Sequence, residues 1–488
     1  MVSMFEDIKG ALERGDTLLC LLQGVAGSGK STFVTFLMAY VRSIGLIAKG
    51  CASTGLAATV YDDFTTAHNL FAIPVQDDEE DYDQEGDFSC NLKMAKYQER
   101  REVLKATRFF AWDEVSSQNM RDIRAVFEDD VIDGFKGKVL LLCGDALQIT
   151  PVVKGGNKSA ICASSIYCSE YMAKLKVYTF TKTLRFTDNS GGGSQLLYSK
   201  FVKCISINTI PDLEEGQPFS IACDAQQSAG VKRLYIPKIT TLMDERAVLD
   251  FCFEDGFRTE SMHKSCILAA TNVQVDKWNK EVQALNPNKP AHELMSKDSV
   301  DLCDDPHGYL KAMVTEDVMN RYEDAGSAPP HLLTLKVNDV AILMRSVDKK
   351  VKLATNTRVR IIGISPLIVR VCTLDGKICA NLPRFLFSIK LPYGKSFEMT
   401  RRQFPLRLAY SLSINRSQGQ TFDGRVVVDL TKHCFMHGHL NVALSRIRDC
   451  KNIAVHVLDT DVDVMNEMFI TSNVVYPEIL KALGDMAI

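Results

Sequence analysis

The sequence GVAGSGKS occupies residues 24 to 31 and directly follows the apolar run TLLCLLQ at residues 17 to 23. It fits the pattern GxxxxGK followed by Ser or Thr, in which glycines let backbone N–H groups approach phosphate oxygens and the next helix N-terminus favours negative charge. From average composition, this pattern arises by chance in a chain of this length about once in fifty. We therefore predict a phosphate-binding loop between a strand and a helix. Lys30 is expected to reach the β- and γ-phosphates, and Ser31 to bind Mg²⁺.

Apolar runs of strand length alternate with helical stretches over the first third of the chain. In order they are TLLCLLQG, KSTFVTFLMAYVRSIG, LIAKGCAST, RFFAWDE and KVLLLCGD. Short buried strands separated by helices predict a parallel sheet with crossover helices, which is an α/β fold. From about residue 335 to 400 the runs are short, β-branched and separated by turns, which predicts a small antiparallel β-module.

The composition of the chain excludes several classes of protein. Its 488 residues are 46% hydrophobic and 24% charged, which excludes wholesale disorder and predicts about three structural units. No apolar run approaches the ~18 residues of a membrane helix, and the N-terminus lacks a signal-peptide pattern. Fifteen cysteines without a CxxC pair predict reduced thiols in an intracellular protein, in preference to a disulfide framework.

Charge is unevenly distributed along the chain. The stretch DDEEDYDQEGD at residues 77 to 87 contains eight of the 60 acidic residues and no basic residue. The remaining sequence therefore carries 57 basic against 52 acidic residues. A mildly basic body is compatible with nucleic-acid binding without requiring it, and the acidic run itself is best interpreted as a solvated surface loop.

A second apolar strand, RFFAW at residues 108 to 112, ends in Asp113 and Glu114. Both carboxylates are predicted to lie at the carboxyl edge of the parallel sheet, where open α/β sheets bind ligands. There, Asp113 is expected to hold the Mg²⁺ shell, and Glu114 to orient and deprotonate an attacking water. Trp112 is expected to pack in the core.

A third strand, VLLLCGD, leads into ALQITPV at residues 146 to 152. The amide of Gln148 can donate and accept hydrogen bonds, so it can contact both a γ-phosphate and the attacking water. Standing alone, this glutamine would indicate only a polar turn. Three such elements on successive strands instead predict ATP hydrolysis coupled to movement.

The order of these motifs resembles that of superfamily one helicases, and specifically of the petite-integration-frequency-type (PIF-type) DNA helicases, with RecD-type and Dda-type enzymes as relatives. The resemblance covers about residues 20 to 460. Besides the phosphate loop and WDEVSS, it rests on ASTGLAA at 52 to 58, TTAHNLFAIP at 65 to 74, GFKGKVLLLCGDALQITPVV at 134 to 153, LRF at 184 to 186 and LAATN at 268 to 272. Its most specific motifs are PPHLLTLKVNDVAILMR at 329 to 345, RRQFPLRLAYSLSINRSQGQTF at 401 to 422 and HGHLNVALSRI at 437 to 447.

The resemblance implies a motor of two RecA-like P-loop domains with parallel sheets and with ATP in the cleft between them. The implied first domain is residues 1–180, with a small strand-separating wedge inserted at about 71–105. The implied second domain comprises residues 181–334 and 401–488, interrupted at 335–400 by a small SH3-like β-domain.

The resemblance also implies roles for individual residues. Arg185 and Arg446 match arginines that reach the γ-phosphate from the second domain, and arginine stabilises charge on transferring phosphoryl oxygens. Supplying them across a cleft makes hydrolysis depend on domain closure, and Gln418 and Gly419 join the same network. Small hydroxyl and amide side chains can grip DNA phosphates without reading bases. The implied single-stranded DNA contacts are Ser53, Thr54, Thr66 and His68 on the first domain, and Thr271, Asn272, Asn415, Ser417 and Thr421 on the second.

Together, the patterns and the resemblance define one set of candidate site residues. The catalytic candidates are Lys30, Asp113, Glu114, Gln148, Arg185 and Arg446. The nucleotide-binding candidates are Gly24, Val25, Ala26, Gly27, Ser28, Gly29, Lys30, Ser31, Thr32, Gln418 and Gly419, and the Mg²⁺ ligands are Ser31 and Asp113.

Several positions depart from the pattern of these helicases. No upstream adenine-reading glutamine is present, since Gln23 abuts the phosphate loop. Ser117 replaces a usual methionine, His439 a usual glutamine and Asn441 a usual aromatic residue. The spacing of nearby histidines and a cysteine lacks the second ligand pair of a zinc site, which disfavours metal binding by His433, Cys434, His437 and His439.

The leading hypothesis is an ATP-dependent DNA helicase that moves from five-prime to three-prime on single-stranded DNA and unwinds forked duplex, with ATP and Mg²⁺ as cofactors. Such an enzyme would act in DNA replication, repair, recombination or telomere and genome maintenance. We expect a monomeric motor with no membrane partner, nuclear in a eukaryotic host or for a DNA virus and cytoplasmic otherwise. Two alternatives stay open: a superfamily one RNA helicase, because hydroxyls grip both polymers, and a non-motor P-loop ATPase or kinase, which needs no paired arginines.

Overall fold

The chain divides into two compact units in the computed structural model. Unit 1 comprises Met1–Ile239, His433–Lys451 and Leu458–Ile488, and unit 2 comprises Thr240–Lys432 and Asn452–Val457. The acidic run at 77–87 and Arg185 lie outside the described residues. The structure describes residues 1–74, 88–153, 155–181, 194–208, 222–223, 231–237, 240–254, 261–288, 290–302, 328–347, 353–390, 397–463 and 468–481.

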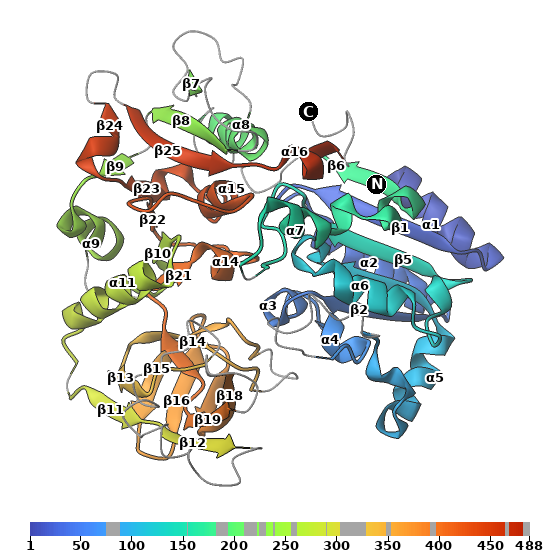
Figure 1. Cartoon of the computed structure of the whole chain (residues 1–488), viewed down its shortest axis with the longest axis horizontal. Coiled ribbons are helices and arrows are strands. Elements are labelled where there is room, and N and C mark those ends of the chain that lie inside the picture. The colour runs from blue at the N-terminus through green and yellow to red at the C-terminus, as the bar shows by residue number, and fades with distance from the viewer. Residues whose placement is uncertain are drawn as a thin grey trace. The chain divides into compact units, whose positions relative to one another are not determined.

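Unit 1 is built on a six-stranded sheet in which all neighbouring strands are parallel (Figure 1). The strand order is β3-β2-β4-β5-β1-β6. The predicted parallel sheet is therefore confirmed, and each of the apolar runs named above forms the expected strand or helix. The strands are β1 (Leu18–Gly24), β2 (Ile47–Ala52), β3 (Thr65–Thr66), β4 (Thr107–Asp113), β5 (Val139–Gly144) and β6 (Lys176–Phe180).

Alternate residues of these strands point into two different cores. Cys20 and Leu22 of β1 pack with α1 (Val2–Arg14) and α2 (Lys30–Ser43), whereas Leu21 belongs to the core on the opposite face. A sheet that is covered on both faces needs strands that are apolar at every position, which explains why the runs do not alternate with polar residues. Trp112 is fully buried in the second core, with its ring 5.5 Å from that of Phe71, which confirms its predicted packing role.

Further helices and one antiparallel sheet complete unit 1. The sheet has the strand order β24-β25-β8-β7. Its strands are β7 (Ala222–Cys223), β8 (Val231–Pro237), β24 (Val462–Asp463) and β25 (Met468–Val474), and the helices are α3 (Gly55–Ala58), α4 (Ala67–Leu70), α5 (Gln98–Ala106), α6 (Met120–Phe127), α7 (Lys158–Ala163), α8 (Ser194–Ile207), α15 (His439–Leu444) and α16 (Pro477–Lys481).

Unit 2 contains a second parallel sheet, with the strand order β21-β10-β22-β23-β9. All five strands come from the segments predicted to form a second RecA-like domain, so the α/β class with two parallel sheets is confirmed. The strands are β9 (Thr240–Leu242), β10 (Cys266–Ala269), β21 (Ser411–Ser413), β22 (Val426–Asp429) and β23 (Ile453–His456), and the helices are α9 (Glu245–Phe253), α10 (Ser261–Lys264), α11 (Asn272–Leu285) and α14 (Ile414–Ser417).

Antiparallel strands form the rest of unit 2, as the β-branched runs predict. One sheet has the order β17-β16-β15-β14-β20, a second β12-β19-β18, and β11 pairs with β13. The SH3-like identity of this module, the wedge and the domain boundaries stay predictions. The strands are β11 (His292–Met295), β12 (Lys297–Leu302), β13 (Leu332–Leu335), β14 (Val340–Leu343), β15 (Arg358–Ile364), β16 (Val369–Thr373), β17 (Cys379–Leu382), β18 (Phe385–Lys390), β19 (Phe397–Gln403) and β20 (Leu406–Leu408).

One cysteine pair departs from the expectation of reduced thiols. Cys372 on β16 and Cys379 on β17 face each other across the two strands and form a disulfide. Most of the other described cysteines are buried as free thiols, including Cys20, Cys51 and Cys143. The pair is brought together by the hairpin register, which the cysteine spacing alone did not reveal.

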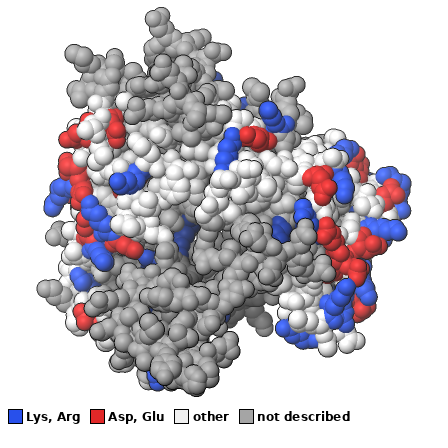
Figure 2. Space-filling model, viewed as in Figure 1, with Lys and Arg blue, Asp and Glu red and all other residues white. Residues whose placement is uncertain are grey.

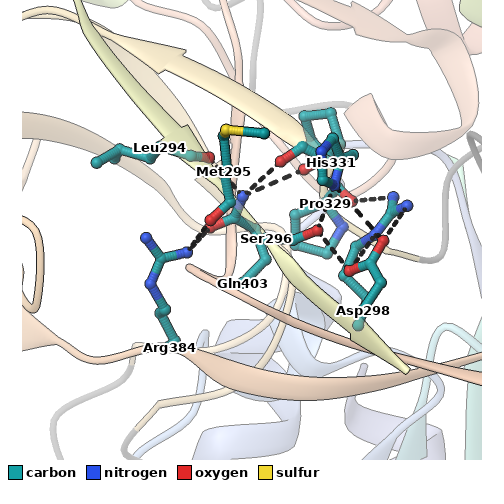
Figure 3. Close-up of polar contacts among 10 residues, drawn as sticks. Leu294, Met295, Ser296, Asp298, Pro329, His331, Arg384 and Gln403 are labelled. Atoms are coloured by element: carbon teal, nitrogen blue, oxygen red, sulfur yellow. Dashed lines mark hydrogen bonds and ion pairs between the residues drawn. The ribbon is translucent and has the colours of Figure 1, made fainter. Parts of the chain in front are cut away.

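The motif RRQFPL gains a structural explanation from a buried polar cluster in unit 2 (Figure 3). The Arg401 guanidinium donates to both carboxylate oxygens of Asp298, at 3.2 and 3.0 Å from Nε and 2.8 Å from Nη2, and both side chains are almost fully buried. Gln403 donates to the carbonyl oxygens of Leu294 and His331 at 2.7 and 2.9 Å, and accepts from Arg384 at 2.7 Å. This motif therefore joins β19 to the chain segments around β11 and β13.

No helix within the described ranges combines the length and the apolar character that crossing a bilayer requires.

Candidate active site

The predicted phosphate loop lies between β1 and α2 of unit 1. β1 ends at Gly24 and α2 begins at Lys30, with Gly27 and Gly29 at φ angles of 75° and 87°. Those left-handed conformations favour glycine, so the spacing of the motif is a backbone requirement. The Lys30 ammonium donates to the Gly24 carbonyl oxygen and, at 3.3 Å, to the Val25 carbonyl oxygen.

The phosphate loop leaves no room for a side chain at Gly24. A Cβ atom added to Gly24 would lie 2.6 Å from Ser28 Oγ and 3.3 Å from Lys30 Cδ, so even a methyl group would intrude. Ser28 Oγ is buried and, within the described part of the chain, has no hydrogen-bond partner. A buried hydroxyl without a partner is costly, and a phosphate oxygen bound in the loop would provide one.

The two predicted Mg²⁺ ligands are linked by a tyrosine. Tyr61 Oη donates to Asp113 Oδ2 at 2.6 Å and also hydrogen bonds with the Ser31 side chain. The other carboxylate oxygen, Asp113 Oδ1, accepts from the Glu114 backbone N–H at 2.8 Å. Burial, followed by the Asp113 carboxylate, raises the pKa of Tyr61, so its hydroxyl keeps its proton and acts as the donor. A carboxylate and a hydroxyl held together in this way offer the hard oxygen ligands that Mg²⁺ prefers.

The residue after Asp113 adopts an uncommon conformation. Glu114 has a φ of 55°, which for a non-glycine residue stores backbone strain. Ser117, which departs from the usual methionine, donates from Oγ to the Glu114 carbonyl oxygen at 3.0 Å. The turn that carries the predicted general base is therefore held by the serine that replaced the methionine.

Gln148 lies in a buried loop, residues 145–148, which we term the Gln148 loop. Its Nε2 donates to Asp145 Oδ2 at 2.9 Å, and its backbone N–H donates to the Asp145 carbonyl oxygen at 3.1 Å. Asp145 Oδ1 accepts from Leu147 N–H at 3.1 Å and from Gln23 Nε2 at 3.3 Å. The Asp145 carboxylate thus fixes the loop internally and joins it to the last residues of β1.

Gln23 uses both halves of its amide on this loop. While Nε2 donates to Asp145, Oε1 accepts from Ala146 N–H at 3.2 Å and from Tyr167 Oη at 2.9 Å. Gln23 is 4% exposed, so this side chain is fully engaged. It connects the phosphate loop with the Gln148 loop.

Arg446 follows α15 within unit 1. Its Nε donates to the Val442 carbonyl oxygen at 2.9 Å and its Nη2 donates to Ser445 Oγ at 2.8 Å, and the side chain is 2% exposed. The structure therefore locates Arg446 in the same compact unit as Lys30, Asp113 and Gln148. The other cross-cleft candidates, Gln418 and Gly419, follow α14 in unit 2.

The candidate DNA contacts of unit 1 gather at the carboxyl edge of its parallel sheet. Ser53 and Thr54 follow β2 and Thr66 ends β3, and those strands pair side by side. Thr54 and Thr66 cap α3 and α4 by accepting backbone N–H groups, so each hydroxyl proton stays available to a phosphate. His68 is half-buried, with Nε2 3.7 Å from Asp122 Oδ2.

The candidate DNA contacts of unit 2 follow two neighbouring parallel strands, β10 and β21. Thr271 caps α11, and its Oγ1 donates to Gln274 Oε1 at 2.8 Å. Asn272 is exposed, and Asn415 and Thr421 are half-buried. Ser417 is fully buried, and its hydroxyl donates to the Ile414 carbonyl oxygen at 2.7 Å, so this side chain stabilises α14.

Sequence reasoning missed Tyr61, Gln23, Asp145 and Tyr167 as members of the site. Asp145 was within a recognised motif, but Tyr61 lies in a loop that fits no pattern. Among the described residues, no group of three His, Cys, Asp or Glu side chains is arranged to hold a metal ion. On the face drawn in Figure 2, basic and acidic side chains of unit 1 are interspersed.

The comparisons with known proteins agree with the motif pattern. The model of the PIF1-like helicase family matches residues 2–210. The ATP-dependent DNA helicase PIF1 of Danio rerio is 24% identical over 461 residues, which cover 91% of this chain. The chain spans 59% of the length of that relative.

Two solved structures share the fold across almost the whole chain. The Pif1 helicase from Bacteroides in complex with ADP-AlF3 and ssDNA has a TM-score of 0.59 and 19% identity, covering 92% of this chain and 91% of that one. The Pif1 helicase from Candida albicans has a TM-score of 0.58 and 20% identity, covering 98% of each chain. The similarity extends through both parallel sheets, well beyond the residues that the family model matches.

Proposed function

We propose that this chain, whose residues 2–210 match the model of the PIF1-like helicase family, is an ATP-dependent DNA helicase that moves from five-prime to three-prime along single-stranded DNA and unwinds duplex. The observation that carries the proposal is a polar cluster made of two hydrogen-bonded networks at the carboxyl edge of the unit 1 sheet. Hydrogen bonds in that cluster join Ser31 to Asp113 through Tyr61, and β1 to Gln148 through Gln23 and Asp145. Such a cluster suits triphosphate hydrolysis better than simple nucleotide binding.

In this proposal, the phosphate loop binds ATP and Lys30 contacts its terminal phosphates. Ser31 and Asp113 would hold Mg²⁺, which neutralises charge on the phosphate oxygens when bound. Glu114 orients the attacking water and accepts its proton, and Gln148 contacts the γ-phosphate and that water. The buried, doubly held Asp113 supports this assignment, because its carboxylate is oriented before any ligand arrives.

Two arginines are assigned to the transferring phosphate. Arg446 stabilises charge on the γ-phosphate oxygens during hydrolysis, and Arg185 is proposed to assist, together with Gln418 and Gly419. The hydrogen bonds of Arg446 to Val442 and Ser445 support a fixed guanidinium.

DNA is proposed to bind along the carboxyl edges of the two parallel sheets. The Ser53 backbone N–H donates to the Asp113 carbonyl oxygen at 3.1 Å, so the DNA candidates of unit 1 are directly connected to the strand whose Asp113 would hold Mg²⁺. Ser53, Thr54, Thr66 and His68 would contact phosphates there, and Thr271, Asn272, Asn415 and Thr421 in unit 2. The biological setting is proposed to be DNA replication, repair, recombination or telomere maintenance, in the nucleus of a eukaryotic host or for a DNA virus and otherwise in the cytoplasm.

The deciding experiment measures both ATP turnover and strand separation. We expect single-stranded DNA to stimulate hydrolysis strongly, and a forked DNA with a free five-prime tail to be unwound, whereas a three-prime tail alone is not sufficient. Matching RNA forks should be poor substrates. Equal hydrolysis with and without DNA would favour a non-motor P-loop ATPase, and preferential unwinding of the RNA forks would favour an RNA helicase.

A further inference from the structure

Residues 437–441, which we term the docking turn, lie against the Gln148 loop within unit 1. His437 Nε2 is 2.8 Å from the Ala146 carbonyl oxygen, and Asn441 Nδ2 donates to the Leu147 carbonyl oxygen at 2.7 Å. Two consecutive peptide carbonyls just before Gln148 are therefore bound by side chains nearly 300 residues further along the chain. Asn441 is one of the positions at which the sequence departs from the family pattern.

The hydrogen bonds of His437 determine which ring nitrogen carries the proton. The Tyr476 backbone N–H donates to His437 Nδ1 at 2.9 Å, so Nδ1 is an acceptor. Nε2 must then carry the hydrogen of a neutral ring and donate it to Ala146. His437 is fully buried, and both nitrogens are bonded to backbone groups. The imidazole consequently joins three separate chain segments, and both of its ring nitrogens are used in these hydrogen bonds.

Gly438 lets the docking turn approach the Gln148 peptide itself. Its φ is 73°, and a Cβ atom at this position would lie 2.6 Å from both the carbonyl carbon and the carbonyl oxygen of Gln148. The Gly438 N–H donates to the Val474 carbonyl oxygen at 3.2 Å. Conformation and contact both require glycine here, so the turn packs on the loop backbone without an intervening side chain.

The Gln148 loop is thus held from two sides. Gln23 and Asp145 bind it from the β1 side, and the docking turn binds its carbonyls from the other. Gln148 Oε1 is buried and has no hydrogen-bond partner within the residues that the structure describes. The loop therefore holds the Gln148 amide oxygen in a fixed place without a hydrogen bond, although a hydrogen bond to this buried oxygen would be favourable.

We propose that His437 and Asn441 are positioning residues that hold Gln148 in its reactive placement, and that they connect it to the α15 segment ending in Arg446. The inference rests on the proposed function, since it assumes that Gln148 contacts the γ-phosphate. Neither positioning residue touches nucleotide in this scheme. Their removal should slow turnover while leaving nucleotide affinity nearly unchanged, because the phosphate loop is intact.

The test compares Asn441→Leu with a matched control, Asn473→Leu. Both asparagines are buried in unit 1, and both donate Nδ2 to a backbone carbonyl at 2.7 Å, Asn473 to Ile205. Steady-state hydrolysis with saturating single-stranded DNA gives kcat and KM, and a fluorescent ADP titration gives nucleotide affinity. We expect kcat to fall about tenfold in Asn441→Leu, the effect of about one hydrogen bond, with ADP affinity unchanged and Asn473→Leu at the parent kcat.

Double variants with Gln148→Ala separate this inference from the proposed function. If Asn441 acts through Gln148, adding Asn441→Leu to Gln148→Ala causes no further loss of kcat, whereas independent effects would multiply. Multiplying effects, or an Asn441→Leu kcat equal to that of Asn473→Leu, would overturn the positioning role. An unchanged kcat in Gln148→Ala would instead overturn the assignment of Gln148 itself.

A second variant keeps the proposal testable if Asn441→Leu folds poorly. His437→Gln retains an N–H donor near the Nε2 position and loses the acceptor for Tyr476, whereas His437→Asn retains an acceptor and loses the donor to Ala146. We expect His437→Gln to keep most of the parent kcat and His437→Asn to lose it. The reverse order would contradict a role that acts through the Ala146 carbonyl.

Discussion

Removal of one hydroxyl should test the proposed Mg²⁺-binding part of the site separately from the phosphate loop. Tyr61→Phe deletes the oxygen that donates to Asp113 and hydrogen bonds with Ser31, and it leaves the ring stacked on Phe64 at a centroid distance of 3.8 Å. A hydrogen bond to a charged group contributes about 1.5–3 kcal/mol. At about 1.4 kcal/mol per factor of ten, losing it should weaken Mg²⁺-dependent nucleotide binding by roughly 10- to 150-fold.

The assay measures binding of fluorescent ADP with Mg²⁺ and with a chelator, together with KM and kcat for ATP. The loss should appear only when Mg²⁺ is present, because the phosphate loop itself is unchanged. In the presence of chelator, the affinity of Tyr61→Phe for ADP should stay within about twofold of the parent value, because substitutions at independent sites have nearly additive effects. Excess Mg²⁺ should recover part of the turnover.

Tyr178→Phe is the matched control for this experiment. Tyr178 Oη donates to Asp7 Oδ2 at 2.5 Å, so the control also removes a tyrosine hydroxyl bonded to a carboxylate, outside the nucleotide cluster. It should change neither binding curve. Equal loss of affinity with and without Mg²⁺ in Tyr61→Phe, or the same loss in Tyr178→Phe, would refute the reasoning.

Three further outcomes are expected. Lys30→Ala should abolish phosphate release while anisotropy still detects DNA binding, and full turnover would contradict the assigned phosphate loop. Arg401→Met should lower the stability of unit 2 by about 3–5 kcal/mol, because it leaves the Asp298 carboxylate buried and unpaired. In thermal melts, the double variant Arg401→Met/Asp298→Leu should regain part of the lost Tm. A double variant that is no more stable than Arg401→Met would argue against the broken ion pair as the cause. Burial lowers the pKa of His437, despite the opposing Ala146 carbonyl and Asp145, and lowers that of His439 to about 4. Below about pH 6.5 these histidines take up protons in the unfolded chain and stay neutral in the folded chain. The free energy of unfolding therefore decreases as the pH falls from about 6.5 toward the folded-state pKa. The decrease is up to about 1.4 kcal/mol per pH unit for each histidine. His439→Gln should flatten the fall in Tm between about pH 7 and pH 5, and an unchanged slope would contradict this origin.

The local parts of the fold were predictable because their signals are short-range. The central residues of β1, β4 and β5, LLCLL, FFAW and VLLLC, are apolar at every position, which only a strand covered on both faces requires. The glycines of the phosphate loop indicate backbone conformations with positive φ, and the structure has them at Gly27 and Gly29. Strand ends then locate Asp113 and Gln148 at one edge of the sheet, since parallel strands end on the same side.

The contacts that complete the site depend on residues far apart in sequence. Tyr61 reaches Asp113 across 52 positions, and His437 reaches Ala146 across 291. A tyrosine in an irregular loop and a histidine before a glycine carry no periodicity that predicts such partners. The disulfide of Cys372 likewise follows from the register of a hairpin, not from cysteine spacing.

By itself, the sequence determined the α/β class, the phosphate loop and the ends of the strands that carry its acidic and amide groups. These features follow from local backbone preference and from the burial pattern of single strands. Only the tertiary structure decided that Tyr61 joins the two magnesium candidates and that the docking turn holds the Gln148 loop. Hydrogen bonds between buried groups form wherever packing brings a donor and an acceptor within about 3 Å of each other. No local sequence pattern predicts which distant residues will be brought together in this way.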